Sequence, residues 1–203
     1  MNKFFSLWIL ILCLPFAGRA QSFKDSIEQY RRQYTQELLE DKRAPVKGGD
    51  VRYLRFFAPD RNFCVWADFR ETPGTQPFLI PTHSGKQKPY RQYGVLTFTI
   101  HDTALTLSLY QSIDLINDAS HNGYLFLPFT DLTNYETTYA GGRYLDIALS
   151  DIVNGRCQLD FNKCYNPYCA YADGFSCPIP PQENSLHVAI MAGEKLYVKN
   201  MGE

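Results

Sequence analysis

Residues 96–109 of the chain read LTFTIHDTALTLSL, and this stretch decides the class of fold. Apolar side chains alternate with smaller, mostly polar ones on both sides of a short turn at His101-Asp102-Thr103. The apolar positions are Leu96, Phe98, Ile100, Leu105, Leu107 and Leu109. A period of two residues places such a set on one face of a strand, so the pattern predicts an antiparallel hairpin with one buried face.

The same alternation recurs along the rest of the chain. Shorter runs of it lie at residues 63–69, 124–129, 144–149, 156–161 and 186–192. Residues 196–199 could pair back across Gly193, and Asn154-Gly155 is typical of a two-residue hairpin turn. Roughly eight or nine short strands at this spacing predict a mostly β fold, either an antiparallel β-barrel or a sandwich. We expect residues 21–203 to form a single domain.

Residues 22–40 have a different period, which predicts one N-terminal amphipathic α-helix. Ser22 is placed to cap this helix, with Asp25 three residues further on. The apolar stripe consists of Phe23, Ile27, Tyr30, Tyr34 and Leu38. Such a stripe usually packs against its own domain. The alternative is a helix that docks a partner.

Residues 1–20 have the organisation of a signal peptide. Lys3 supplies a positive start, residues 4–16 form an apolar run too short to span a bilayer, and Gly18 and Ala20 are small residues at the end. We expect cleavage after Ala20 and a periplasmic or secreted protein. No later segment is apolar enough to cross a bilayer, so no stable membrane insertion is expected after cleavage.

The charge balance of the exported chain argues against two classes of partner. Loss of residues 1–20 removes Lys3 and Arg19, which leaves 18 basic residues (20 minus 2) against 21 acidic ones, a net charge near −3. This balance predicts no binding to nucleic acid or to an anionic membrane surface. The expected partner is a small molecule or a component of the cell envelope.

Export makes disulfides the first interpretation of the cysteines. Those after residue 20 are Cys64, Cys157, Cys164, Cys169 and Cys177. A bond from Cys177 to either Cys169 or Cys164 would close a short loop and stabilise the fold by about 2–3 kcal/mol. An odd total leaves at least one free thiol, most simply Cys64.

A metal site built from the last four cysteines is the alternative. Their spacing lacks the paired Cys-x-x-Cys of structural zinc sites, so we expect no metal ion and no cofactor. A nucleophilic thiol needs a neighbouring cationic group to lower its pKa. The histidines lie far from these cysteines in sequence, at His83, His101, His121 and His187.

Residues 129–146 read FTDLTNYETTYAGGRYLD and gather polar groups around a glycine turn. Asp131, Glu136, Tyr139 and Arg143 could form a polar pocket, in which the two carboxyl groups divide acid and base roles. The alternative is a structural clamp, a Glu–Arg pair of the kind common at barrel rims, and the pattern alone favours the clamp.

Residues 159–184 read LDFNKCYNPYCAYADGFSCPIPPQEN and show neither a helical nor a strand period. Backbone without regular pairing has to find its hydrogen-bond partners singly, so such loops usually serve a purpose. One interpretation is a rigid, disulfide-linked cover over one end of the barrel. The other is a pocket wall that carries Asn166, Tyr168 and Glu183.

The motifs of these two segments resemble the DUF1684 family, a group of bacterial and archaeal proteins without an assigned function. The similarity covers residues 125–131, 136–147, 159–171, 177–186 and 189–195, and upstream residues 52–60 and 90–100. The resemblance implies a site that is built from Asp131, Glu136, Arg143, Asn166, Cys169 and Glu183. The family pattern also matches Asp160, Asn162 and Asn184.

Two positions depart from the family pattern. Tyr168 stands where a proline is usual, and Cys164 stands where an alanine is usual. Cys164 therefore looks like a local addition, suited to a disulfide in an exported copy. Relatives without an export signal would keep Cys169 and Cys177 in a reducing compartment, which argues against a purely disulfide role for that pair.

Three functional hypotheses remain, in this order. The first is an exported binding module that holds a small ligand or envelope component in a polar pocket lined by these residues. The second is a hydrolase that uses Asp131 and Glu136 as an acid–base pair beside Arg143, or Cys169 as its nucleophile. The third is a structural or assembly protein that docks a partner through the helix at residues 22–40.

Overall fold

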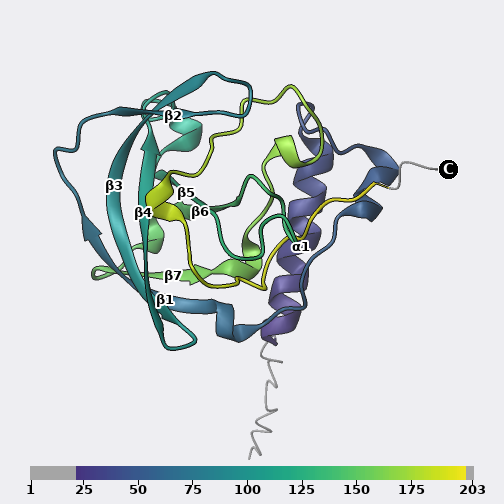
Figure 1. Ribbon diagram of the computed structural model, residues 1–203, viewed down its shortest axis with the longest axis horizontal. Coiled ribbons are helices and arrows are strands. Elements are labelled where there is room, and N and C mark those ends of the chain that lie inside the picture. The colour runs from purple at the N-terminus through teal and green to yellow at the C-terminus, as the bar shows by residue number, and fades with distance from the viewer. Residues whose placement is uncertain (1–21, 200–203) are drawn as a thin grey trace, which may run out of the picture.

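The computed structural model describes residues 22–199, so the predicted signal peptide at residues 1–20 lies outside the described residues. The strands are β1 (Cys64–Glu71), β2 (Phe78–Pro81), β3 (Gln87–Ile100), β4 (Thr103–Ser112), β5 (Tyr124–Phe129), β6 (Arg143–Ala148) and β7 (Arg156–Asp160). They pair antiparallel in the order β6-β5-β4-β3-β1-β7, with β2 joined to β3. Figure 1 shows this seven-stranded sheet curled into a half-barrel. The predicted antiparallel β fold is therefore confirmed, as an open half-barrel.

The hairpin predicted at residues 96–109 is formed by β3 and β4, in which Leu96 lies opposite Leu107. Its turn holds His101 and Asp102 in the left-handed region, with φ angles of 46° and 61°. This geometry matches the right-handed twist of the two strands, although neither turn residue is glycine.

The inward face of the curled sheet holds the main hydrophobic core. Alternate residues of its strands supply the buried side chains, among them Leu96, Leu107, Leu127, Leu145 and Leu159. Burying one leucine of this kind contributes about 1.5–3 kcal/mol, so the two-residue period translates directly into the stability of the sheet.

Residues 186–192, predicted as a strand, form irregular chain instead. Ile190 and Ala192 are buried in the main core, so the alternation did report a buried face. Their backbone groups, however, bond to side chains: Ile190 N–H donates to Asp131, and the carbonyls of Ile190 and Ala192 accept from Arg143. The segment lies within the curl of the half-barrel without pairing to a strand (Figure 1).

The pairing expected at residues 196–199 is also wrong. Leu196 N–H donates to the carbonyl of Thr137, and residues 196–199 belong to no strand. Strand β2 was not predicted; it has only four residues, of which only Ile80 is buried. A short, mostly exposed edge strand leaves little periodic signal.

The outward face of the same sheet carries an aromatic cluster. Its buried members are Ile80, Tyr90, Tyr110, Phe126 and Tyr144, and Tyr124 and Tyr165 pack against them. Along β5 and β6 these rings occupy the positions between the leucines of the main core, because successive side chains of a strand point to opposite faces. The sheet is therefore buried on both faces in this region.

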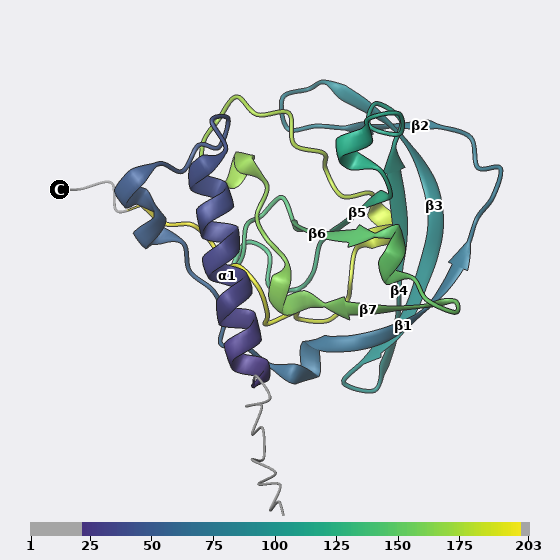
Figure 2. The same cartoon turned by 180° about the vertical axis from the view of Figure 1, so that it is seen from behind.

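The predicted helix is confirmed as α1 (Phe23–Glu40), and Ser22 caps it by accepting a hydrogen bond of 3.1 Å from the Asp25 N–H. Ile27 and Leu38 are buried, and the Tyr30 hydroxyl donates to the carbonyl of Lys163 at 3.2 Å. Figure 2 shows α1 lying along the side of the half-barrel where the loops after β7 and the C-terminal segment pass. The apolar stripe of the helix therefore packs against its own domain.

Short 3₁₀ helices lie at Gly48–Tyr53, Arg61–Phe63, Ala119–His121, Leu149–Asp151, Phe161–Lys163, Tyr168–Ala170 and Gln182–Asn184. Between residues 22 and 199, no helix combines the length and the apolar character needed to cross a membrane.

Candidate functional site

Asp131 and Arg143 form a buried ion pair with 2.8 Å between Oδ2 and the guanidinium, and both side chains are fully buried. Oδ1 of Asp131 accepts from the hydroxyl and N–H of Thr133 and from the N–H of Ile190. Arg143 also donates to the carbonyls of Ile190 and Ala192. The pair therefore binds the irregular C-terminal segment to the sheet, as a structural clamp.

Glu136 and Tyr139 lie outside this clamp. Glu136 is exposed, and no ion pair or side-chain hydrogen bond joins it to Asp131 within the described chain. The ring of Tyr139 lies 5.9 Å from that of His83, centroid to centroid, and burial raises the pKa of Tyr139. The acid–base pair imagined for Asp131 and Glu136 is not assembled here.

Two asparagines of the family pattern tie irregular backbone in place. Asn162 bonds both the N–H and the carbonyl of Asp60 at 2.8 Å, and its N–H and side chain donate to Asp160. Asn184 accepts from the N–H of Ser108 and donates to the carbonyls of Ser108 and Pro128. It thereby bridges β4 and β5, whose ladder contains one residue pair.

Glu183, another residue of the predicted site, accepts the hydroxyl hydrogen of Tyr110 at 2.8 Å. This bond fixes the end of the 159–184 loop against the aromatic face of the sheet. Neither Glu136 nor Glu183 is among the side chains that line the cavity between this aromatic face and the loop.

The cysteines Cys64, Cys157, Cys164, Cys169 and Cys177 are all free thiols, so none of the predicted disulfides is present. Cys164 is buried in the main core beside Ala192, whereas Cys169 and Cys177 adjoin each other, with the Cys169 N–H 3.2 Å from the Cys177 Sγ. Burial raises the pKa of Cys164 to about 11 and that of Cys177 to about 12. Both thiols therefore stay protonated and weakly nucleophilic at neutral pH.

The Cys169 thiol donates to the carbonyl of Phe175 at 3.2 Å. No histidine or other cation among the described residues forms a hydrogen bond with it. In residues 22–199, no group of three or more His, Cys, Asp or Glu side chains is arranged to hold a metal ion.

A cavity of about 590 Å³, hereafter the aromatic cavity, lies between the outward face of the sheet and the 159–184 loop. The sheet wall consists of Tyr90 from β3, Tyr124 and Phe126 from β5, and Tyr144 from β6. The loop wall contains Tyr165, Asn166, Tyr168, Phe175 and Cys177. Its volume falls in the range of ordinary small-ligand pockets, roughly 300–1,000 Å³.

The rings of the aromatic cavity pack against one another across its floor. Tyr90 stacks on Phe126 with centroids 5.6 Å apart, Phe126 meets Tyr144 edge-on at 4.7 Å, and Tyr144 meets Tyr165 edge-on at 6.0 Å. Such contacts stabilise aromatic pairs beyond simple burial, by about 0.5–1.5 kcal/mol each. The rings of the floor therefore hold one another in place.

Most of the tyrosine hydroxyls bond back to the protein. Tyr124 and Tyr165 both donate to Oδ1 of Asp146, at 2.9 and 2.7 Å. Tyr144 donates to the carbonyl of Pro178, and Tyr168 donates to Asp41 at 2.8 Å. These bonds fix the rings and leave mainly carbon surface facing the cavity.

Two cations border the aromatic cavity, Arg43 and Lys88. Arg43 forms an exposed ion pair with Asp41, 3.2 Å between nitrogen and oxygen. Lys88 is partly buried, and no carboxylate of the described chain lies within ion-pair distance of it. The side chains around the cavity include no Asp or Glu.

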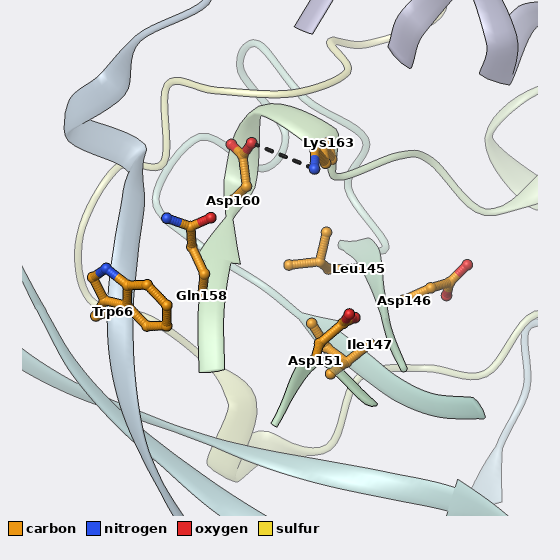
Figure 3. Close-up of a pocket in the computed structure, with 8 residues that line it drawn as sticks. All are labelled: Trp66, Leu145, Asp146, Ile147, Asp151, Gln158, Asp160 and Lys163. Carbon is orange, nitrogen blue, oxygen red and sulfur yellow. Dashed lines mark ion pairs between the residues drawn. The ribbon is translucent and has the colours of Figure 1, made fainter. Parts of the chain in front are cut away.

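A second, smaller cavity of about 230 Å³ lies where the edge strands β6 and β7 face each other without pairing (Figure 3). It is lined by Trp66, Leu145, Asp146, Ile147, Asp151, Gln158, Asp160 and Lys163. Its one cation, Lys163, is paired with Asp160 at 3.9 Å. This opening is smaller and carries more acidic than basic side chains, and it marks the place where the half-barrel does not close.

The residues predicted for the site therefore include some that line the aromatic cavity and others that are buried within the fold. Of the three residues named for the pocket wall, Asn166 and Tyr168 line the aromatic cavity and Glu183 does not. Asp131, Arg143, Asn162 and Asn184 are buried structural groups. The aromatic rings of the sheet wall were missed. Their signal was an apolar residue at consecutive positions of a strand, as in YLFLPF at residues 124–129, which indicates burial on both faces.

Sequence reasoning also missed Glu194, which is fully buried between α1 and the loops. Its carboxyl group accepts hydrogen bonds from the hydroxyls of Tyr34 and Tyr171 and from the N–H of Asn166. Burial raises its pKa from 4.5 to about 7, although these donors favour the ionised form. Glu194 lies in the family-like stretch at residues 189–195, but nothing in that stretch indicated that its carboxyl group would be buried.

The fold and cavity define a class: a small antiparallel half-barrel, filled by its irregular C-terminal segment and flanked by one helix. The family profile described as "Protein of unknown function (DUF1684)" matches residues 50–195. The chain therefore belongs to the DUF1684 family, as the resemblance of its motifs indicated.

The chain is also similar to an uncharacterized protein of Haloarcula marismortui whose solution NMR structure is known. The two share 28% sequence identity, and the match covers 85% of this chain and 97% of that one with a TM-score of 0.63. None of the curated proteins matches the chain.

Proposed function

We propose that the mature protein is an exported binding protein, which holds a small ligand in the aromatic cavity. The observation that carries this proposal is the cavity itself: about 590 Å³, with walls from three strands and one loop. Its rings are already packed against one another, so binding requires little ordering of side chains. The proposed pocket is thus more aromatic than the polar pocket expected from the sequence.

The catalytic hypothesis has less support from the geometry. Asp131 is buried with both carboxylate oxygens occupied, and Glu136 is exposed and does not line the cavity. Cys169 has its thiol bonded to a backbone carbonyl. A general base has to reach its substrate, and a nucleophilic thiol needs a group that favours the thiolate.

The test is a thermal-shift screen of residues 21–203 with small metabolites and envelope components, followed by calorimetry of the compounds that raise the melting temperature. Leu115→Trp narrows the cavity, because Leu115 lines it and an indole is larger than the leucine side chain. Ile116→Trp is the matched control, since the neighbouring Ile116 is exposed and does not line the cavity.

We expect Leu115→Trp to weaken binding at least about tenfold, because an indole takes up the space of the ligand, and Ile116→Trp to leave the affinity unchanged. A screen without any stabilising compound would count against the proposal, as would a ligand that both variants bind equally. Export is tested separately, by measuring the mass of the protein recovered from the periplasm or the medium. That mass should correspond to a chain that begins at Gln21.

A further inference from the structure

We infer that the ligand of the aromatic cavity is an anion with a flat aromatic body, whose acidic group lies at Lys88. This inference rests on the proposed function and narrows it to a chemical class. Three features of the cavity carry it: the arrangement of its rings, the use of its hydroxyl groups, and the sign of its charges.

The rings favour a flat aromatic ligand. Tyr90 and Phe126 are nearly parallel, at 28°, and Tyr144 stands edge-on to Phe126, at 76°. Tyr168 and Phe175 form a second edge-on pair on the loop wall, with centroids 5.4 Å apart. A planar ring entering between the two walls can stack on some of these rings and meet others edge-on, which are the two preferred arrangements of aromatic pairs.

The hydrogen bonds of the tyrosines disfavour a sugar or another polyol. The hydroxyls of Tyr124, Tyr165, Tyr144 and Tyr168 all donate to groups of the protein. A ligand rich in hydroxyl groups would leave many of them without partners in this cavity, and each unpaired buried hydroxyl costs about 1–3 kcal/mol. The wall therefore selects for carbon surface in the body of the ligand.

The charges favour an anion. Lys88 and Arg43 border the cavity, and its lining contains no Asp or Glu. Arg43 is already engaged by Asp41, which also accepts the hydroxyl hydrogen of Tyr168, so this part of the rim is held in place by the protein itself. Lys88 is partly buried and has no ion-pair partner in residues 22–199. A carboxylate or phosphate beside Lys88 would gain a charge-assisted hydrogen bond there.

The test uses four probes that separate charge from aromaticity. They are 2-naphthoate, 2-naphthylmethanol, 2-naphthylmethylammonium and decahydro-2-naphthoate, titrated into residues 21–203 by calorimetry at low salt. We expect 2-naphthoate to bind at least about tenfold more tightly than the neutral and the cationic naphthyl probes, and more tightly than its saturated analogue. The advantage over the neutral probe should shrink in high salt.

Lys88→Gln should remove most of the preference for 2-naphthoate over 2-naphthylmethanol, while the affinity for the alcohol stays the same. Lys86→Gln is the matched control, because Lys86 lies two residues away, is exposed, and does not line the cavity. Loss of the preference in both variants would place the acidic group elsewhere and overturn the role of Lys88.

The outcomes separate this inference from the proposal beneath it. Equal affinity for all naphthyl probes, abolished by Leu115→Trp, would keep the binding function and overturn the anionic class. A stabilising compound from the screen, together with no binding of any naphthyl probe, would overturn the aromatic class. A protein that binds neither probes nor screened compounds would refute both.

Discussion

The buried carboxyl group of Glu194 is expected to make the free energy of unfolding depend on pH. Replacing Glu194 with glutamine should remove most of that dependence. Glu194 is fully buried, and its oxygens accept from Tyr34, Tyr171 and the N–H of Asn166. Burial outweighs these donors and raises the pKa of Glu194 from 4.5 to about 7. The folded protein therefore keeps a proton that the unfolded chain releases between these pH values.

The sign of the effect follows from the raised pKa. The contribution of Glu194 to the free energy of unfolding is fully present below pH 4.5 and is lost as the pH rises through about 7. Each tenfold change in proton affinity corresponds to about 1.4 kcal/mol, so the loss amounts to about 3 kcal/mol. Glutamine keeps the shape of the protonated side chain and has no charge to bury at any pH.

The assay is urea unfolding of both proteins at intervals from pH 4.5 to pH 8.5. We expect the stability of Glu194→Gln, relative to the unsubstituted protein, to rise by about 3 kcal/mol across this range. Asp146, whose pKa burial also raises, is present in both proteins, so its contribution cancels in the comparison. Glu136→Gln, at an exposed carboxyl group, is the control for the loss of one carboxyl group elsewhere on the protein.

Parallel stability curves for Glu194→Gln and the unsubstituted protein would refute this reasoning. They would mean that the three donors hold the carboxyl group ionised in the folded state, so that hydrogen bonding and not burial decides its protonation. In that case the glutamine variant should also be less stable at every pH, because a charged acceptor would have been replaced by a neutral one.

Two further predictions concern the clamp and the thiols. Asp131→Asn should lower the free energy of unfolding by about 3–5 kcal/mol, because it leaves Arg143 buried without its counter-ion; Asp68→Asn, at an exposed ion pair, should cost less than about 1 kcal/mol in the same urea titration. Equal losses would show that the buried pair has no special weight. Oxidised glutathione should link Cys169 to Cys177 by thiol–disulfide exchange, since the two residues adjoin each other. Peptide mapping that finds both thiols free would contradict this.

The β fold could be predicted because a two-residue period of apolar side chains has one main cause, the burial of one face of a strand. Leu96 and Leu107 alternate with polar residues since one face of β3 and β4 is buried, and the turn between them is short enough to fix the register. The same signal misled at residues 186–192. There the alternation again reports burial, but the backbone groups of Ile190 and Ala192 bond to Asp131 and Arg143, which no periodicity can reveal.

The candidate site was harder to predict because sequence motifs for sites consist mainly of polar residues in loops, whereas this cavity is lined mostly by aromatic side chains. Asp131, Arg143, Asn162 and Asn184 are conspicuous in the sequence, yet each is buried and bonded to the backbone of another part of the chain. From the sequence alone, a polar side chain that hydrogen-bonds to the backbone of a loop cannot be distinguished from one that binds a ligand. Only the register of the strands and the path of the loop distinguish the two.

The cavity nevertheless depends on buried polar side chains of this kind, because they hold one of its walls in place. The loop that forms one wall of the cavity has little regular pairing, so side chains have to hold it in place. Asn166 shows the connection in one residue: its N–H donates to Glu194, its side chain donates to the carbonyl of Lys195, and it lines the cavity. Asn166 therefore connects the Glu194 carboxyl group to the wall of the aromatic cavity, so the protonation state of Glu194 should affect the position of that wall. A ligand that needs this wall in place should accordingly bind most tightly under the conditions in which the Glu194 network is most stable.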